Sequence, residues 1–170
     1  MKRKIMATTT LTKLNATKND LPEAKRETVV GLLQEKLVSA IDMQLQAKQA
    51  HWNVKGPSFI ALHELFDAIV AEAREWVDEI AERITALGGV ADGRAKTVAA
   101  KSALDAYPLE IRTGPEHVEA LANALAAFGK SVRKGIDAAE AEGDAGTQDL
   151  FTQISRAVDK QLWFVESHNN

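Results

Sequence analysis

The segment FIALHELFDAIVAEAREWVDEIAERITAL, residues 59–87, decides the fold. Its apolar residues recur at steps of three, four or sums of these, the spacing of one face of an α-helix. These apolar residues are Leu62, Phe66, Ile69, Val77, Ile80, Ile84 and Leu87. Gly88-Gly89 follows and is typical of a helix end. The segment therefore predicts a long helix with one face in a hydrophobic core.

Three further long helices are predicted, over residues 20–53, 113–143 and 146–166. The first has Asp20 as a candidate N-cap, and its apolar stripe is Val29, Leu33, Leu37, Ile41 and Leu45. The linker 88–113, with a short helix near 95–103, is long enough to run back along the bundle and make its two flanking helices parallel. We therefore predict an all-α, ferritin-like four-helix bundle over residues 20–170 with a long crossover between helices 2 and 3.

Composition limits the chemistry available to this chain of 170 residues. It contains no cysteine, so disulfides and thiolate metal sites are excluded. Any metal must be held by histidine and carboxylate, ligands that suit iron, manganese or zinc. No apolar run is long enough to cross a bilayer, and the start MKRKIMATTT lacks the apolar segment of a signal peptide. We expect a cytoplasmic protein without membrane contact.

Residues 1–19 differ from the rest of the chain and are predicted to form a flexible basic arm. The segment lacks helical periodicity, and no acidic residue precedes Asp20. Its basic residues are Lys2, Arg3, Lys4, Lys13 and Lys18. Met6 is an alternative start, and translation from it would remove the first three of these cations.

Four polar residues of the segment 59–87 form a second stripe, away from the apolar one. With His63 as reference, Asp67, Asp78 and Glu82 fall within about 100° of it around the helix. Asp67 and Asp78 are separated along the axis by about 16 Å. Metal–ligand bonds of about 2 Å cannot span this distance. The two halves of the stripe must therefore serve different ions or different chains.

The numbering of the stripe suggests a symmetric solution. The pairs His63/Glu82 and Asp67/Asp78 are both centred between residues 72 and 73. Two copies of the helix crossing antiparallel about a two-fold axis at that point would bring these pairs together twice. His51, at the end of the first helix, could complete each site. For each residue alone, an ordinary solvated helix surface remains the alternative.

The same residues carry a family resemblance. Lys48-Gln-Ala-His51-Trp52-Asn53, His63-Glu-Leu-Phe-Asp67 and Asp78-Glu-Ile-Ala-Glu82-Arg83 resemble the signature of Dps-type miniferritins, the DNA-binding proteins from starved cells. Residues 86–90 and 162–164 are also similar to the family. The resemblance extends from about residue 20 to the end of the chain. The E-x-x-H pair of ferritins with a di-iron site inside one bundle is absent.

The resemblance implies a hollow homododecamer that oxidises Fe(II), preferably with hydrogen peroxide, and stores the ferric mineral. In the family, His51, His63 and Asp67 would come from one subunit, and Asp78 and Glu82 from its two-fold mate. Other divalent metals could occupy the same ligands. Trp52 resembles a tryptophan thought to intercept stray oxidising equivalents, with interface packing as the alternative. Trp76 and Trp163 are expected to be packing residues.

Two further features have open alternatives. Glu140, Glu142 and Asp144 could line an electronegative Fe(II) channel in a shell, or form a solvated helix end. The resemblance also implies protection of DNA and non-specific binding to it through the basic arm, in a nucleoid-associated protein. The alternative functions are an architectural DNA-compacting shell with little iron chemistry and an unmetallated helical interaction protein.

Overall fold

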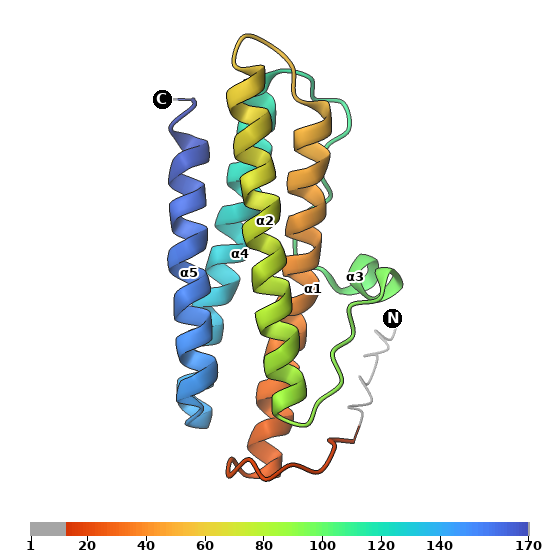
Figure 1. Ribbon diagram of the computed structural model, residues 1–170, viewed down its shortest axis with the longest axis vertical. Helices are drawn as coiled ribbons and strands as arrows, with labels where there is room; N and C mark the ends of the chain where they lie inside the picture. The colour runs from red at the N-terminus through yellow and green to blue at the C-terminus, as the bar shows by residue number, and fades with distance from the viewer. Residues whose placement is uncertain (1–12, 170) are drawn as a thin grey trace, which may run out of the picture.

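The helix predicted over residues 59–87 forms, and three other long helices pack with it (Figure 1). The computed structural model describes residues 13–169. Its helices are α1 (Glu23–Asn53), α2 (Phe59–Ala86), α3 (Ala95–Lys101), α4 (Gly114–Glu142) and α5 (Ala145–Glu166). In Figure 1, α1 and α5 run upward while α2 and α4 run downward. The parallel arrangement of α2 and α4 confirms the predicted ferritin-like bundle with its crossover.

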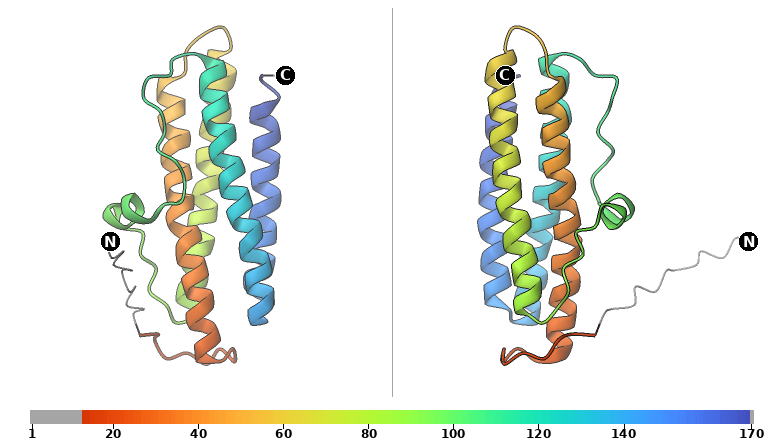
Figure 2. Two further views of the ribbon diagram at one scale, coloured as in Figure 1. Left: turned by 180° about the vertical axis from the view of Figure 1, so that it is seen from behind. Right: turned by 45° about the vertical axis from the view of Figure 1, so that its right-hand side comes forward.

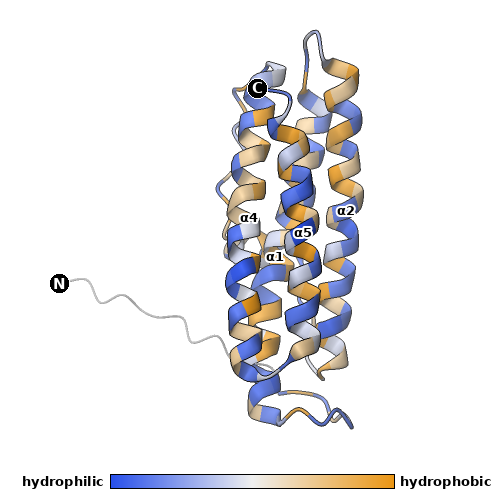
Figure 3. Cartoon of the chain, turned by 90° about the vertical axis from the view of Figure 1, so that its left-hand side faces the viewer, coloured by the Kyte–Doolittle hydropathy of each residue, from blue (hydrophilic) through white to orange (hydrophobic). Residues whose placement is uncertain are grey.

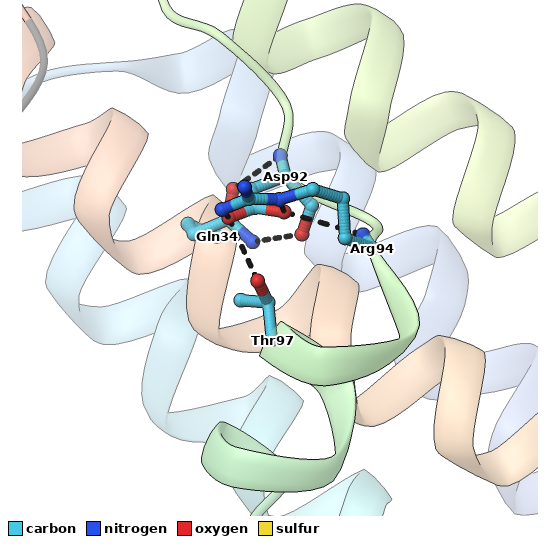
Figure 4. A network of polar contacts seen from close by, with 4 residues as sticks. All are labelled: Gln34, Asp92, Arg94 and Thr97. Carbon is cyan, nitrogen blue, oxygen red and sulfur yellow. Dashed lines mark hydrogen bonds and ion pairs between the residues drawn. The ribbon is translucent and has the colours of Figure 1, made fainter.

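The crossover between α2 and α4 runs beside α1 in both views of Figure 2. The Gln34 amide fixes it by donating to the carbonyl of Asp92 and accepting the Asp92 N–H, at 2.9 and 2.8 Å (Figure 4). The Asp92 carboxylate accepts hydrogen bonds from Arg94 and Thr97. Further along, Gln46 donates to the carbonyl of Asp105. Side chains of α1 therefore hold the crossover at two levels.

The ends of α4 follow the predicted signals. The carboxylate of Glu116 accepts the backbone N–H groups of Arg112 and Thr113 and the hydroxyl of Thr113. These hydrogen bonds lower the pKa of Glu116 to about 2. At the other end, Gly143 has a φ of 76°, the left-handed conformation that commonly ends a helix.

The predicted N-cap of the first helix is wrong, because Pro22 occupies that position in place of Asp20.

The core contains the predicted stripe of α2, but the prediction of Leu45 as part of the apolar stripe of α1 is wrong. Leu45 is 58% exposed. Residues spaced by four rotate about 40° per step around a helix, so the last residue of the α1 stripe has left the core. Trp76 is buried and stacks on Phe128, as predicted for a packing residue. Trp163 is 63% exposed in the single chain and contacts Phe164.

Polar residues interrupt the apolar faces of the long helices. Figure 3 shows hydrophilic and hydrophobic residues interspersed along α2 and α5. Among the helices of residues 13–169, none is both long and apolar enough to span a bilayer.

The predicted arm, residues 1–19, divides into two parts. Lys2, Arg3 and Lys4 lie outside the described residues. Residues 13–19 are docked on the end of α2, where Leu14 is buried and the Asn15 N–H donates to the carbonyl of Gly88 at 2.7 Å. Gly88 has a φ of 87°, and a Cβ there would lie 2.6 Å from the Asn15 carbonyl oxygen. Lys13 and Lys18 remain exposed.

Asp144 joins α5 to α2 and does not belong to an exposed acidic cluster. Its side chain is buried, caps α5 through the Thr147 N–H, and pairs with Arg83 at 2.7 Å. Thr147 also donates its hydroxyl to Asp144 and accepts from Arg83. The sequence-based assignment of Asp144 to a channel is therefore wrong, because the carboxylate is already occupied inside the bundle.

We predict that Asp144→Asn destabilises the protein in a pH-dependent way. Burial alone would raise the pKa of Asp144, but hydrogen bonds from Thr147 and the charge of Arg83 hold it below its usual value. The stabilisation is therefore full above the ordinary aspartate pKa of about 3.9 and is lost as the pH falls through the lowered folded value. Thermal unfolding at pH 7 should show a loss of about 1–2 kcal/mol.

The matched control is Asp149→Asn, an exposed carboxylate on the same helix. Its unfolding midpoint should stay close to that of the natural chain. An Asp144→Asn variant that is as stable as the natural chain at pH 7 would contradict the role assigned to the ion pair.

Candidate metal centre

His51 and His63 lock together the last turn of α1 and the first turns of α2. The Nδ1 of His51 lies 2.8 Å from the carbonyl oxygen of His63, and the Nδ1 of His63 lies 2.8 Å from the carbonyl oxygen of His51. The two rings stack with their centroids 3.6 Å apart. The turn between α1 and α2 is short, so His51 and His63, 12 positions apart in the sequence, can contact each other in this reciprocal way.

The reciprocal contact determines which ring nitrogens are available. A carbonyl oxygen only accepts hydrogen bonds, so Nδ1 of each ring must carry its hydrogen. In the neutral rings, both Nε2 atoms then carry lone pairs. Backbone carbonyls that orient histidine in this way are typical of metal sites. The pair is therefore organised as two nitrogen ligands before any ion binds.

Asp67 lies one turn beyond His63 on α2 and is the third predicted ligand of this half. Its Oδ1 lies 4.0 Å from Nδ1 of His51 and accepts a hydrogen bond of 2.5 Å from Nζ of Lys48. The Lys48 hydrogen bond lowers the pKa of Asp67, although partial desolvation acts in the opposite direction. The carboxylate is therefore ionised, and one of its oxygens is paired with the Lys48 ammonium.

The second half of the predicted site lies further along α2. Asp78 and Glu82 are exposed and form no ion pair or side-chain hydrogen bond with another residue between 13 and 169. The described part of one chain contains no group of three or more His, Asp and Glu side chains that could hold a metal ion. One chain thus places His51, His63 and Asp67 near one another without assembling them into a ligand group, and leaves Asp78 and Glu82 apart from them.

Several large apolar side chains near the ends of α1 and α2 are exposed in the single chain. Trp52 is 66% exposed, Ile60 is 61% exposed, and Leu45 is 58% exposed. The Phe59 ring lies 5.0 Å from that of His63, measured between centroids.

Sequence reasoning missed Lys48. The signal was present, because Lys48 precedes His51 by three residues and therefore shares its face of α1. Its contact with Asp67 depends on how α1 and α2 are paired, which helical spacing alone does not give. The backbone carbonyls that orient the histidines also have no signature in side-chain identity.

The remaining acidic candidates lie at the opposite end of the bundle, where α4 ends. Glu140 is exposed and Glu142 is half-buried. The backbone carbonyl of Glu142 accepts a hydrogen bond from Lys25 at 2.7 Å. With Asp144 buried, two carboxylates of the predicted cluster remain on the surface.

Known proteins share this fold and much of this sequence. The ferritin-like domain family matches residues 30–170. A DNA protection during starvation protein from Agrobacterium fabrum is 46% identical over 156 residues, covering 92% of this chain and 96% of that protein. The structure of Mycobacterium smegmatis Dps in its tetragonal form has a TM-score of 0.86 at 34% identity, covering 91% of this chain and 94% of that one.

A further structure, DpsA14 from Streptomyces coelicolor, has a TM-score of 0.88 at 32% identity and covers 93% of this chain and 94% of that one. The family match spans most of the bundle and the whole crossover. The chain therefore belongs to the Dps-type miniferritins of the ferritin-like superfamily.

Proposed function

We propose that the protein oxidises Fe(II) with hydrogen peroxide at sites shared between two subunits and stores the ferric product in a hollow dodecamer. The observation that carries the proposal is the reciprocal histidine contact, which leaves a lone pair on Nε2 of each ring, in a pair whose His51 ring lies 4.0 Å from the ionised Asp67 carboxylate. Imidazole and carboxylate together suit iron, the substrate of the proposed reaction. Membership of the Dps-type family supports iron storage in general terms.

The missing ligands would come from a second copy of α2. A two-fold axis between residues 72 and 73 brings Asp78 of one copy to Asp67 of the other, and Glu82 to His63. The exposed residues nearest that point are Ala71 and Arg74, and the small side chain of Ala71 permits close approach of two helices. Each pair of subunits would then carry two equivalent sites, each with two imidazoles and three carboxylates.

The carboxylates would favour Fe(III) over Fe(II) and so promote oxidation, while the histidines help to retain the divalent ion. Hydrogen peroxide takes one electron from each of two Fe(II) ions and two protons, and yields two water molecules without releasing hydroxyl radical. Trp52, exposed directly after His51, is placed to intercept stray oxidising equivalents. Glu140 and Glu142 could attract Fe(II) to a channel.

Lys48 has a defined part in this scheme. Its ammonium pairs with Asp67, and a cation that binds through the same oxygen would displace it. Lys48 therefore keeps Asp67 ionised, as metal binding requires. It also lowers the affinity of Asp67 for a metal ion, because the ion has to compete with the ammonium group. The Lys48 side chain is 30% exposed, so it can move to solvent when displaced.

We predict that Asp78→Ala/Glu82→Ala abolishes rapid iron oxidation. Loss of the two carboxylates removes the ligands supplied by the second subunit, while the histidine half stays intact. Fe(II) is bound anaerobically, peroxide is added, and Fe(III) formation is followed by absorbance. The control is Asp137→Ala/Glu119→Ala, two exposed acids on α4. Equal oxidation rates in the natural chain and the Asp78→Ala/Glu82→Ala variant would refute the site.

We also predict that Lys48→Gln tightens Fe(II) binding. An exposed ion pair is worth about 0.2–1 kcal/mol, so removing this competitor should lower the Fe(II) dissociation constant by about 1.4- to five-fold. Anaerobic calorimetry measures the constant, with Lys96→Gln on α3 as an exposed control. Weaker binding by Lys48→Gln would mean that the lysine supports the site.

Non-specific binding and protection of DNA form a second proposed activity. The similar protein from Agrobacterium fabrum is called a DNA protection during starvation protein. Lys13 and Lys18 are exposed, next to a segment that also contains Lys2, Arg3 and Lys4. Many copies of such an arm on one shell would make weak phosphate contacts that release counterions. The chain itself has a net charge of −3, so these contacts would oppose general repulsion.

We predict that removing the arm cations abolishes a DNA gel shift at low salt. The variant deletes residues 1–12 and carries Lys13→Gln and Lys18→Gln, which leaves Leu14 and Asn15 to hold the end of α2. The natural chain should shift DNA at low salt and lose binding as salt rises. An unchanged shift in the variant would exclude the arm, and intact-mass measurement determines whether the native arm starts at Met1 or Met6.

A further inference from the structure

We propose that Lys36 is a modification site, whose amine forms a Schiff base with a small aliphatic aldehyde in a groove between α1 and the crossover. The groove has a volume of about 950 Å³, which is enough for a small organic molecule. Lys36 lines it from α1 and Ser131 lines it from α4. None of the five predicted metal ligands lines this groove, so the proposal does not depend on the iron site.

Lys36 is buried but its amine is not sealed from solvent. The residue is 6% exposed, which is unusual for a lysine. Its stem packs against α4 at Gly135, where an added Cβ would lie 3.4 Å from Cε of Lys36. Nζ lies 3.6 Å from the Glu35 carboxylate, too far for a hydrogen bond. Because Nζ is not among the unpaired polar atoms that are fully buried, it keeps access to the groove.

The surroundings of Lys36 favour the neutral amine. Desolvation by burial lowers the pKa of Lys36 most strongly, Glu35 opposes this shift, and the positive charge of Lys134 adds to it. The side chain of Glu35 is 72% exposed, so solvent screens its effect. Desolvation and a neighbouring cation are the means by which proteins obtain a nucleophilic lysine, since only the free amine attacks a carbonyl group.

The other acid that lines the groove is already engaged. Asp92 accepts hydrogen bonds from Arg94 and Thr97, while Gln34 binds its backbone (Figure 4). The hydrogen bonds from Arg94 hold the pKa of Asp92 well below its usual range. Of the two acids among the described lining residues, this leaves Glu35 to pair with Lys36.

The lining also fits the proposed reactant. Val30 and Val38 provide apolar surface that an aliphatic chain can cover. In the reaction, the Lys36 nitrogen attacks the carbonyl carbon and a carbon–nitrogen double bond replaces the carbon–oxygen double bond. The oxygen leaves as water with the two hydrogens of the neutral amine. The atoms therefore balance without an oxidant, a reductant or a cofactor.

Reductive alkylation of the assembled, metal-free protein tests the proposal. Propionaldehyde is added at pH 7 with sodium cyanoborohydride, which traps the imine as a stable secondary amine, and the reaction is stopped at low conversion. Peptide mass spectrometry then compares Lys36 with Lys96, an exposed lysine on α3. Each unit by which a lysine pKa is lowered raises the free-amine fraction at neutral pH about tenfold. We expect Lys36 to react at least about threefold faster than Lys96.

A second variant separates the reactivity of the amine from its accessibility. Glu35→Gln removes the carboxylate that opposes the lowered pKa, so the rate at Lys36 should rise by about 1.4- to five-fold, as for the loss of an exposed ion pair. The matched control is Glu23→Gln, an exposed acid on the same helix, which should leave the rate unchanged. A Lys36 that reacts no faster than Lys96 would overturn the proposal. So would a rate at Lys36 that Glu35→Gln does not raise.

Discussion

The reciprocal hydrogen bonds between His51 and His63 are the contact on which the proposed chemistry depends. Each imidazole donates to the other residue's carbonyl oxygen, so one interaction sets the helix pairing and the ring tautomers together. Carbonyl oxygens near the end of α1 and the start of α2 supply the acceptors. The turn that joins α1 and α2 therefore determines which imidazole nitrogens are available to bind a metal, as well as how the two helices meet.

The other end of α2 is held just as firmly. Arg83 connects it to the buried Asp144 at the start of α5, and Gly88 accepts a hydrogen bond from Asn15. Asp78 and Glu82 lie on the exposed side of this rigid helix. Their spacing from His63 and Asp67 is consequently fixed by helix geometry. The protein presents two half-sites at a constant separation, an arrangement suited to a symmetric partner.

Much of the fold could be predicted because it follows from periodicity and helix-end signals. The α2 stripe, the Thr113/Glu116 cap and Gly143 are local features, and all three formed as expected. The errors at Leu45 and at the first N-cap were local, but two others arose where contacts between distant segments decide the outcome. Nothing in the sequence indicated that Asp144 pairs with Arg83, or that Leu14 is buried against the bundle. Spacing predicted the candidate site residues on α2, but the contact of Lys48 with Asp67 depends on how α1 and α2 are paired.

The central claim is that each iron site combines two chains, and a complementation experiment tests it most directly. One variant, His63→Ala/Asp67→Ala, lacks the histidine half, and the other, Asp78→Ala/Glu82→Ala, lacks the acidic half. Each alone should assemble but not oxidise Fe(II) rapidly. Co-assembled in equal amounts with random pairing, they should recover about a quarter of the natural site number, since each mixed pair regains one intact site. Mixed shells that remain as inactive as the separate variants would contradict the shared site.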